Sequence, residues 1–176
     1  MKLIQAKKIS YDYAHKRKYK DIRYIVVHNT ANRGDSSLGN CNYFKTYNTL
    51  QAGAHIFGDQ KGYFLRSIRL NRTAWAVGGF YTNKNGAAKY YGKCTNYNSV
   101  SIELCDIVTK NPSKAMLKGL KNTIKYIQRW CPNATTIIRH WDVNGKDCPS
   151  RLKGTNNKRW KAILKYLGYK KGKKIK

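Results

Sequence analysis

The strongest constraint on the fold is a set of three short β-branched runs, separated by longer segments with helical periodicity. The runs are RYIVVHN (23–29), NSVSIELC (98–105) and TTIIRH (135–140). Short runs rich in Val and Ile are typical of buried strands, and the apolar–polar alternation of the second run indicates a strand with one polar face. Strands interleaved with helices predict a mixed α/β fold.

Three other segments have the residue spacing of helices. Segment 36–49 places apolar or aromatic residues close to helical spacing, with one of its two leading serines as the N-cap. Segment 111–130 has an apolar stripe after an Asn-Pro start. Segment 156–168 has a second stripe, which Gly168 ends.

A hairpin and a long loop lie between the first two β-branched runs. Segment 54–68 predicts strands at 54–57 and 63–68, joined by a turn through 58–62. The polar stretch 78–98 predicts a loop, and loops of this length in compact domains tend to be functional. We find no internal repeat and no linker, so the 176 residues predict one domain.

The charge of the chain points to its partners. There are 36 Lys and Arg against 8 Asp and Glu, a formal net charge of +28. This balance predicts an anionic target, which is a nucleic acid, an anionic membrane surface or the phosphate-rich polymers of a bacterial envelope. The densest basic run, YKKGKKIK (169–176), is predicted to be a solvated, frayed terminus.

Targeting and redox signals are weak. No apolar run approaches the roughly 18 residues that a membrane span requires. The N-terminal segment lacks the apolar middle of a signal peptide, so we expect synthesis in the cytoplasm and release by another route. The five cysteines are irregularly spaced and odd in number, which favours a reduced origin over a disulfide framework.

Two histidines and a cysteine have the composition of a zinc site. His28 and His140 each end a predicted strand, and Cys148 lies in RHWDVNGKDCPS (139–150), where Gly145 and a proline predict a loop rather than a helix. Two imidazoles and a thiolate would give zinc three ligands and leave the fourth position open, as in catalytic sites. Taken alone, His28 is more often a hydrogen-bonded residue at a strand end.

Hydrolysis would also need a base and an oxyanion partner. Glu103 is the only glutamate, and it lies on the polar face of its strand, where it could take a proton from water and pass it to a leaving nitrogen. Lys146 lies two residues before Cys148, where a cation could stabilise an oxyanion. Simple pairing of Glu103 with a basic side chain is the alternative. The conjunction predicts metal-assisted hydrolysis of an amide.

These segments resemble the motifs of one family. IVVHNTAN with His28, NSVSIELC with Glu103, and RHWDVNGKDCPSRL are similar to the motifs of zinc-dependent N-acetylmuramoyl-L-alanine amidases, in the branch shared by phage endolysins and peptidoglycan recognition proteins. The resemblance runs from about Tyr24 to the last helix. It implies a mixed central sheet flanked by helices, and cleavage of the amide between N-acetylmuramic acid and the L-alanine of the stem peptide.

The resemblance also implies roles for individual residues. By the resemblance, zinc would be held by His28, His140 and Cys148, with Glu103 and Lys146 as the catalytic residues. The implied substrate contacts are His55, Trp75 and Asn29, with a packed structural role as the alternative for the first. Two positions depart from the pattern, because Ala54 replaces an aromatic residue and Ala76 replaces a histidine.

We expect a catalytic domain at 1–168 and a basic tail at 169–176, in a chain that acts as a monomer on bacterial peptidoglycan. Its basic surface would bind anionic wall polymers, and the protein would reach the wall after holin-type release or lysis. A non-catalytic peptidoglycan-binding module is the second hypothesis. A basic nucleic-acid-binding protein is the third, although no recognised nucleic-acid motif occurs and that hypothesis leaves the His, Glu and Cys positions unexplained.

Overall fold

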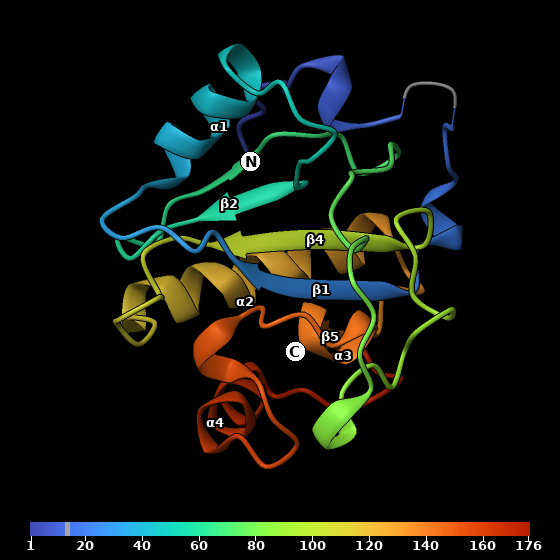
Figure 1. Ribbon diagram of the computed structural model, residues 1–176, viewed down its shortest axis with the longest axis vertical. Coiled ribbons are helices and arrows are strands. Elements are labelled where there is room, and N and C mark those ends of the chain that lie inside the picture. Colours follow the sequence, from blue (N-terminus) through green and yellow to red (C-terminus); the bar gives the residue numbers. More distant parts are fainter. Residues whose placement is uncertain (13–14) are drawn as a thin grey trace.

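A computed structural model describes residues 1–12 and 15–176 and shows a mixed sheet between two layers of helices (Figure 1). The strands are β1 (Tyr24–Asn29), β2 (Ile56–Gly58), β3 (Phe64–Arg66), β4 (Ser99–Leu104) and β5 (Thr136–Arg139). The α-helices of the described residues are α1 (Ser37–Thr46), α2 (Lys114–Trp130), α3 (His140–Asn144) and α4 (Lys158–Leu167). Short 3-10 turns lie at Lys8–Ser10, Tyr19–Asp21, Lys84–Gly86 and Ser150–Leu152.

The sheet has the strand order β3-β2-β4-β1-β5. β2, β4, β1 and β5 pair in parallel, and the short edge strand β3 returns antiparallel to β2. In this register His28 lies opposite Glu103, and Val27 lies opposite Arg139. The carboxyl ends of β1, β4 and β5 therefore meet at one edge of the sheet, as the sequence predicted for His28 and His140.

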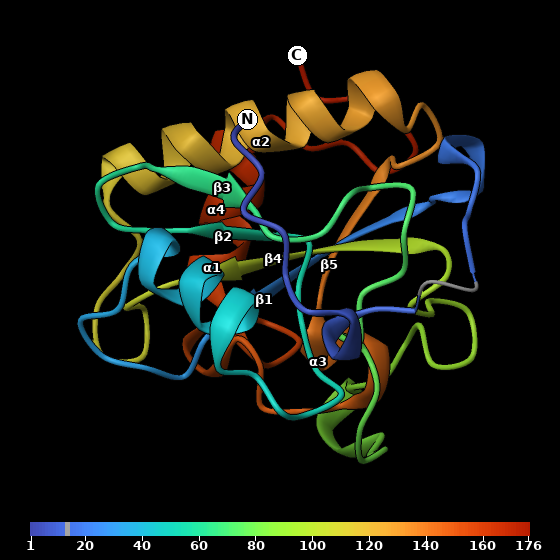
Figure 2. The same cartoon turned by 90° about the horizontal axis from the view of Figure 1, so that it is seen from above.

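The two faces of the sheet have different neighbours. Figure 2 shows α2 on one side and α1 with α3 on the other. The large core lies on the α2 side, where strand residues such as Ile25 and Ile102 pack against α2 and α4. Because successive side chains of a strand alternate between faces, Val26 packs in a separate cluster with Val143 of α3.

Local capping explains the bounds of the long helices. Ser113 caps α2 by accepting a hydrogen bond from the backbone N–H of Met116 at 3.0 Å. Asn157 caps α4 through the N–H of Trp160 at 2.9 Å, and Gly168 ends that helix in the left-handed conformation. The predicted helices are confirmed, and the first begins after Ser36.

Two local predictions were wrong. Segment 139–150 is not a loop throughout, because the five-residue helix α3 begins at His140, directly after β5, and ends at Gly145 at φ +86°. The basic terminus is not frayed, because the side chain of Ile175 is buried and its N–H donates to Gln128 Oε1 at 2.9 Å. Apolar burial outweighs the charge of the run, so 169–176 packs beside α2. The domain boundary at 168 stays a prediction.

Among the described residues, no helix combines the length and the apolar character that crossing a bilayer requires. The predicted hairpin is present with shorter strands, and stretch 78–98 contains no strand or α-helix.

Candidate metal and catalytic site

Three candidate ligands come together at the carboxyl edge of the sheet. The side chains of His28, His140 and Cys148 are all buried, and their ligand atoms lie within 4.8 Å of one another. The two imidazole rings are 4.7 Å apart between centroids, and Cys148 Sγ lies 3.7 Å from His28 Nδ1. This spacing suits one ion bound by all three atoms.

Alternation within the strands places these groups on one face. Ile25 and Val27 point toward α2, so His28 points to the opposite face with Val26. In β4 the same rule sends Ile102 and Leu104 into the α2 core and leaves Glu103 on the His28 side. Strand alternation therefore places polar groups from distant segments on one face of the sheet.

Several polar atoms at this point are buried without a partner. Within residues 1–12 and 15–176, no hydrogen-bond partner is found for three of these buried atoms, which are His28 Nε2, His140 Nε2 and Glu103 Oε2. Buried polar groups are normally satisfied, so these atoms fit a group that would bind to them. Two imidazoles and a thiolate fit zinc better than magnesium or calcium.

The imidazoles are held neutral, as metal ligation requires. Burial lowers the pKa of His28 well below its usual value, and the neighbouring His140 and Lys146 lower it further. Burial, followed by the charge of Lys146, lowers the pKa of His140 to about 4. Hydrogen bonds to the backbone of Val77 and Gly78 oppose this shift and orient the ring.

The thiol and the carboxyl are shifted in the other direction. Burial raises the pKa of Cys148 to about 12, and the Glu103 charge adds to this shift. Burial also raises the pKa of Glu103 from 4.5 to about 8, although the charge of Lys146 opposes the change. A cation between the ligands would stabilise the thiolate form of Cys148.

The base candidate is close to the metal ligands. Glu103 Oε1 lies 3.9 Å from His28 Nδ1, and the Glu103 side chain is 20% exposed. It thus reaches solvent through the cavity while remaining mostly desolvated. Lys146 is exposed at the cavity wall, and its charge acts on the pKa values of both histidines, Glu103 and Cys148.

A cavity of about 800 Å³ opens over these groups. Trp75 and Asn29, two of the predicted substrate contacts, line it. Ala54 and Ala76 also line it, so the small side chains at these departures from the motif leave the cavity wider. The Asn29 amide oxygen accepts the Ser150 N–H at 3.0 Å, which ties β1 to the segment after Cys148.

His55 is not among the residues that line this cavity, which favours the packed structural role given as its alternative. The side chain is 1% exposed, and its Nδ1 accepts the backbone N–H of Ser101 at 3.1 Å. Its Nε2 lies 2.7 Å from the buried guanidinium of Arg17 and 3.0 Å from the Arg72 carbonyl. It is the packed structural histidine of the alternative hypothesis, because its partners are all internal.

The sequence analysis missed Asp35, whose position depends on tertiary contacts. Asp35 lines the cavity, yet it lies in a segment with no motif. Its position directly before the Ser36 N-cap is only a weak signal for a site. Tyr43, the next candidate for the base after Glu103, also lines the cavity.

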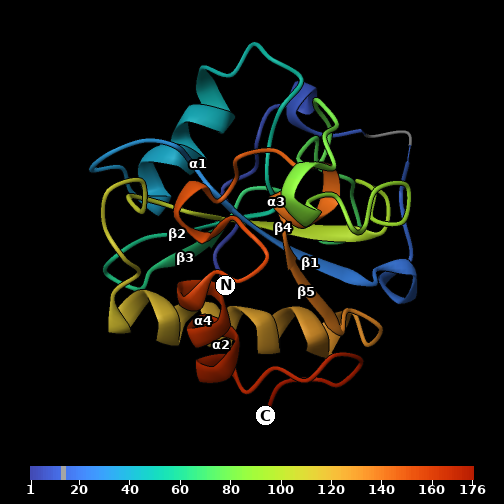
Figure 3. The same cartoon turned by 60° about the horizontal axis from the view of Figure 1, so that its bottom comes forward.

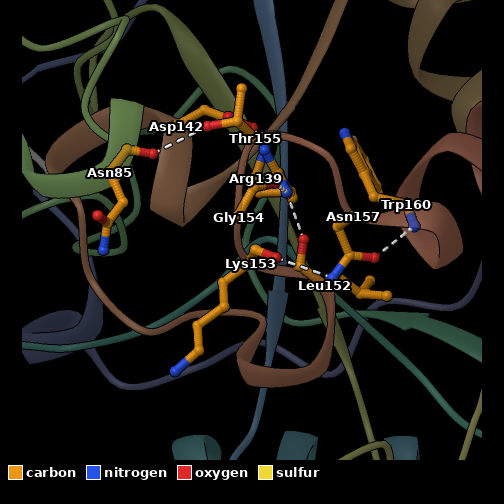
Figure 4. Close-up of polar contacts among 9 residues, drawn as sticks. All are labelled: Asn85, Arg139, Asp142, Leu152, Lys153, Gly154, Thr155, Asn157 and Trp160. Carbon is orange, nitrogen blue, oxygen red and sulfur yellow. Dashed lines mark hydrogen bonds and ion pairs between the residues drawn. The ribbon is translucent and has the colours of Figure 1, made fainter.

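Arg139 was missed as well. It connects the two segments that carry the candidate ligands His140 and Cys148. Its Nε and Nη2 donate to the Asp142 carboxylate at 2.8 and 2.7 Å, and its Nη1 donates to the carbonyls of Leu152 and Gly154 (Figure 4). The guanidinium lies 4.6 Å from the ring centroid of Trp141. Arg139 directly precedes His140, so these bonds link the end of β5 to the segment that follows Cys148.

Comparison with known proteins identifies a family with this arrangement. The family described as N-acetylmuramoyl-L-alanine amidase matches residues 18–151, a span that contains every candidate ligand and catalytic residue. The chain is 30% identical over 158 residues to N-acetylmuramoyl-L-alanine amidase CwlA of Bacillus subtilis (strain 168). The match covers 84% of this chain and 52% of CwlA, so the chain spans about half the length of that curated relative.

Solved structures share the fold. PlyL superposes with a TM-score of 0.70 at 23% identity, covering 98% of both chains. The catalytic domain of PlyG has a TM-score of 0.70 at 22% identity, covering 96% of this chain and 94% of that domain. The arrangement of sheet and helices is therefore shared with these proteins at low sequence identity.

Proposed function

The chain belongs to the N-acetylmuramoyl-L-alanine amidase family, and from this premise we propose that it hydrolyses the amide between N-acetylmuramic acid and the L-alanine of the peptidoglycan stem peptide. One observation supports the proposal most. The ligand atoms of His28, His140 and Cys148 converge within 4.8 Å in a cavity that also contains Glu103 and Lys146. A binding module would need neither the ligands nor a buried carboxyl beside them.

The proposed cofactor is one zinc ion, held by His28, His140 and Cys148. When bound, zinc supplies a Lewis acid that polarises the amide carbonyl and increases the acidity of water. The neutral imidazoles provide lone pairs, and Asn29 and Arg139 hold the strand ends and the Cys148 segment in place.

The protein's own groups move the protons. Glu103 takes a proton from the attacking water at a carboxylate oxygen and passes it to the leaving nitrogen of L-alanine. Without the metal, burial raises the pKa of Glu103 to about 8, and a bound cation would oppose this shift and favour the carboxylate that accepts the proton. The Lys146 ammonium stabilises the negative charge that forms on the carbonyl oxygen. Trp75 contacts the substrate from the cavity wall.

The proposed action is on the cell wall. A product assay tests it: purified peptidoglycan is digested and the new end groups are measured. We expect new N-terminal L-alanine, no new reducing sugars, and about one zinc per chain by elemental analysis. Cys148→Ser is the matched control and should release none.

New reducing ends would instead indicate cleavage of the glycan chain. New ends at other residues of the stem peptide would indicate a peptidase of different specificity. Wall binding by a zinc-loaded protein without any cleavage would support the binding-module hypothesis.

A further inference from the structure

One face of the molecule is basic throughout. Segments 107–141 and 148–176 contain no Asp or Glu. In the helices and terminus of these segments the basic residues are exposed, apart from Lys121, which is half-buried. They are Lys114, Lys118, Lys121, Lys125 and Arg129 on α2, Lys158, Arg159, Lys161 and Lys165 on α4, and Lys170, Lys171, Lys173, Lys174 and Lys176 in the terminus. We call this set the basic face.

The α2 members form one stripe. Lys114, Lys118, Lys121, Lys125 and Arg129 follow one another at steps of three or four residues, so they share one side of the helix. The opposite side is buried against the sheet. At 1.5 Å rise per residue the stripe is about 22 Å long, with one positive charge roughly every 5–6 Å.

The other members lie next to this stripe. α4 contacts α2, and the terminus packs beside α2 through the hydrogen bond between Ile175 N–H and Gln128 Oε1. Figure 3 shows α2, α4 and the C-terminus gathered on one side of the molecule. Within the described residues, no member of the basic face forms an ion pair. Their charge is thus available to a partner.

The acidic residues are concentrated elsewhere. Asp35, Glu103 and Asp147 line the cavity. Of the others, Asp59 accepts a hydrogen bond from Ser37, Asp106 from Gly34, and Asp142 from Arg139. No Asp or Glu lies on α2, α4 or the terminus.

We propose that the basic face is a docking surface for a linear phosphodiester polymer of the bacterial cell wall, and that it holds the protein on the wall while the cavity stays open to peptidoglycan. The proposal rests on the proposed function for its choice of polymer. Regular charge along a helix matches an extended polyanion, which releases counterions on binding. The apolar stripe of α2 is buried in the core, so α2 offers mainly charge to a partner, with Trp130 at its end as the large exposed apolar side chain.

The test compares two variants of equal net charge. The face variant replaces Lys114, Lys118, Lys121, Lys125 and Arg129 with Gln, which keeps helix propensity. The control variant replaces five exposed lysines away from the basic face with Gln, namely Lys7, Lys45, Lys84, Lys89 and Lys93. Binding to purified wall teichoic acid is measured as a function of salt, beside duplex DNA and anionic phosphatidylglycerol vesicles. Hydrolysis of a small uncharged muropeptide is measured separately.

We expect the face variant to bind wall teichoic acid about tenfold or more weakly at 0.1 M salt, with a log–log salt slope shallower by about three to five. The control should lose less than about threefold. Equal losses in both variants would overturn the proposal, since the charge would then act without a defined surface. Tighter binding of DNA or vesicles than of teichoic acid would also overturn it. Failure of the parent to hydrolyse the muropeptide would count against the proposed function alone.

Discussion

The proposed metal site and the basic face use charge in opposite ways. At the metal site a few groups are buried, and their pKa values are shifted by desolvation and by one another. On the basic face fourteen charges are spread over two helices and the terminus, almost all in contact with solvent. The same sheet separates the two regions (Figure 2).

This difference determines how each region responds to change. Salt screens the interactions of a buried group only weakly. Removing such a group leaves its buried partner without a hydrogen bond, which has a high cost in free energy. Exposed charges are screened by salt, and single pairs between them contribute about 0–1 kcal/mol. We therefore expect single substitutions to abolish function at the metal site, whereas the basic face should respond gradually to the number of charges.

Loss of a metal ligand should give the largest effect. We expect Cys148→Ser and His28→Ala each to abolish amidase activity and to weaken zinc binding strongly, because two protein ligands remain of three. Activity on muropeptide and zinc content by elemental analysis check this. Near-normal turnover with zinc bound in either variant would show that the ligand set is wrong.

Glu103→Gln should separate catalysis from stability. Activity should fall by about two to four orders of magnitude, the usual scale for a general base, while zinc stays bound. In the metal-free protein the folded state takes up a proton at Glu103, so the stability contributed by this residue falls as pH rises from 4.5 to about 8. The metal-free variant should therefore unfold at a higher temperature than the metal-free parent at pH 8.

Each 1 kcal/mol that the substitution adds to the free energy of unfolding raises the Tm by about 2–4 °C. Thermal unfolding at pH 4 and pH 8 supplies the measurement, with a small difference expected at the lower pH. Equal Tm values at pH 8 would mean that the Glu103 carboxyl is not desolvated. Full activity of the variant would assign the base to another residue, such as Tyr43.

Arg139→Gln tests how far the metal site depends on its supporting contacts. The variant loses the bonds to Asp142, Leu152 and Gly154, so we expect zinc affinity to fall about 10–100-fold in a chelator competition. Lys153→Gln is the control, because it removes only the exposed pair with Asp147 on the same segment. Equal zinc affinity in the two variants would show that Arg139 does not position the ligands.

The smallest effects should come from the terminus. Deleting 170–176 removes the burial of Ile175, which should destabilise the protein by about 1.5–3 kcal/mol. Replacing its five lysines with Gln should leave the Tm unchanged and weaken wall binding only partly. Thermal unfolding and a wall-binding assay distinguish the two variants. A Tm unaffected by the deletion would return the terminus to the frayed state that its charge suggested.

The sequence by itself determined the elements and the chemistry. Short runs of β-branched residues and apolar stripes are local patterns, so β1, β4, β5, α2 and α4 could be predicted within a few residues. Strand alternation likewise predicted that Glu103 points away from the core. The residue types at 28, 140 and 148 indicated zinc because imidazole and thiolate suit that ion.

Only the tertiary structure decided which polar groups meet. His28 and His55 both lie on predicted strands, yet packing places His28 at the cavity and His55 against Arg17. The contacts of Arg139 with Leu152 and Gly154 depend on how the chain returns after Cys148. The number of charged residues could be counted from the sequence. The position of the basic face, on the other side of the sheet from the cavity, follows from how the helices cover the sheet. Local patterns are set by neighbours along the chain, whereas these features are set by contacts between residues far apart in it.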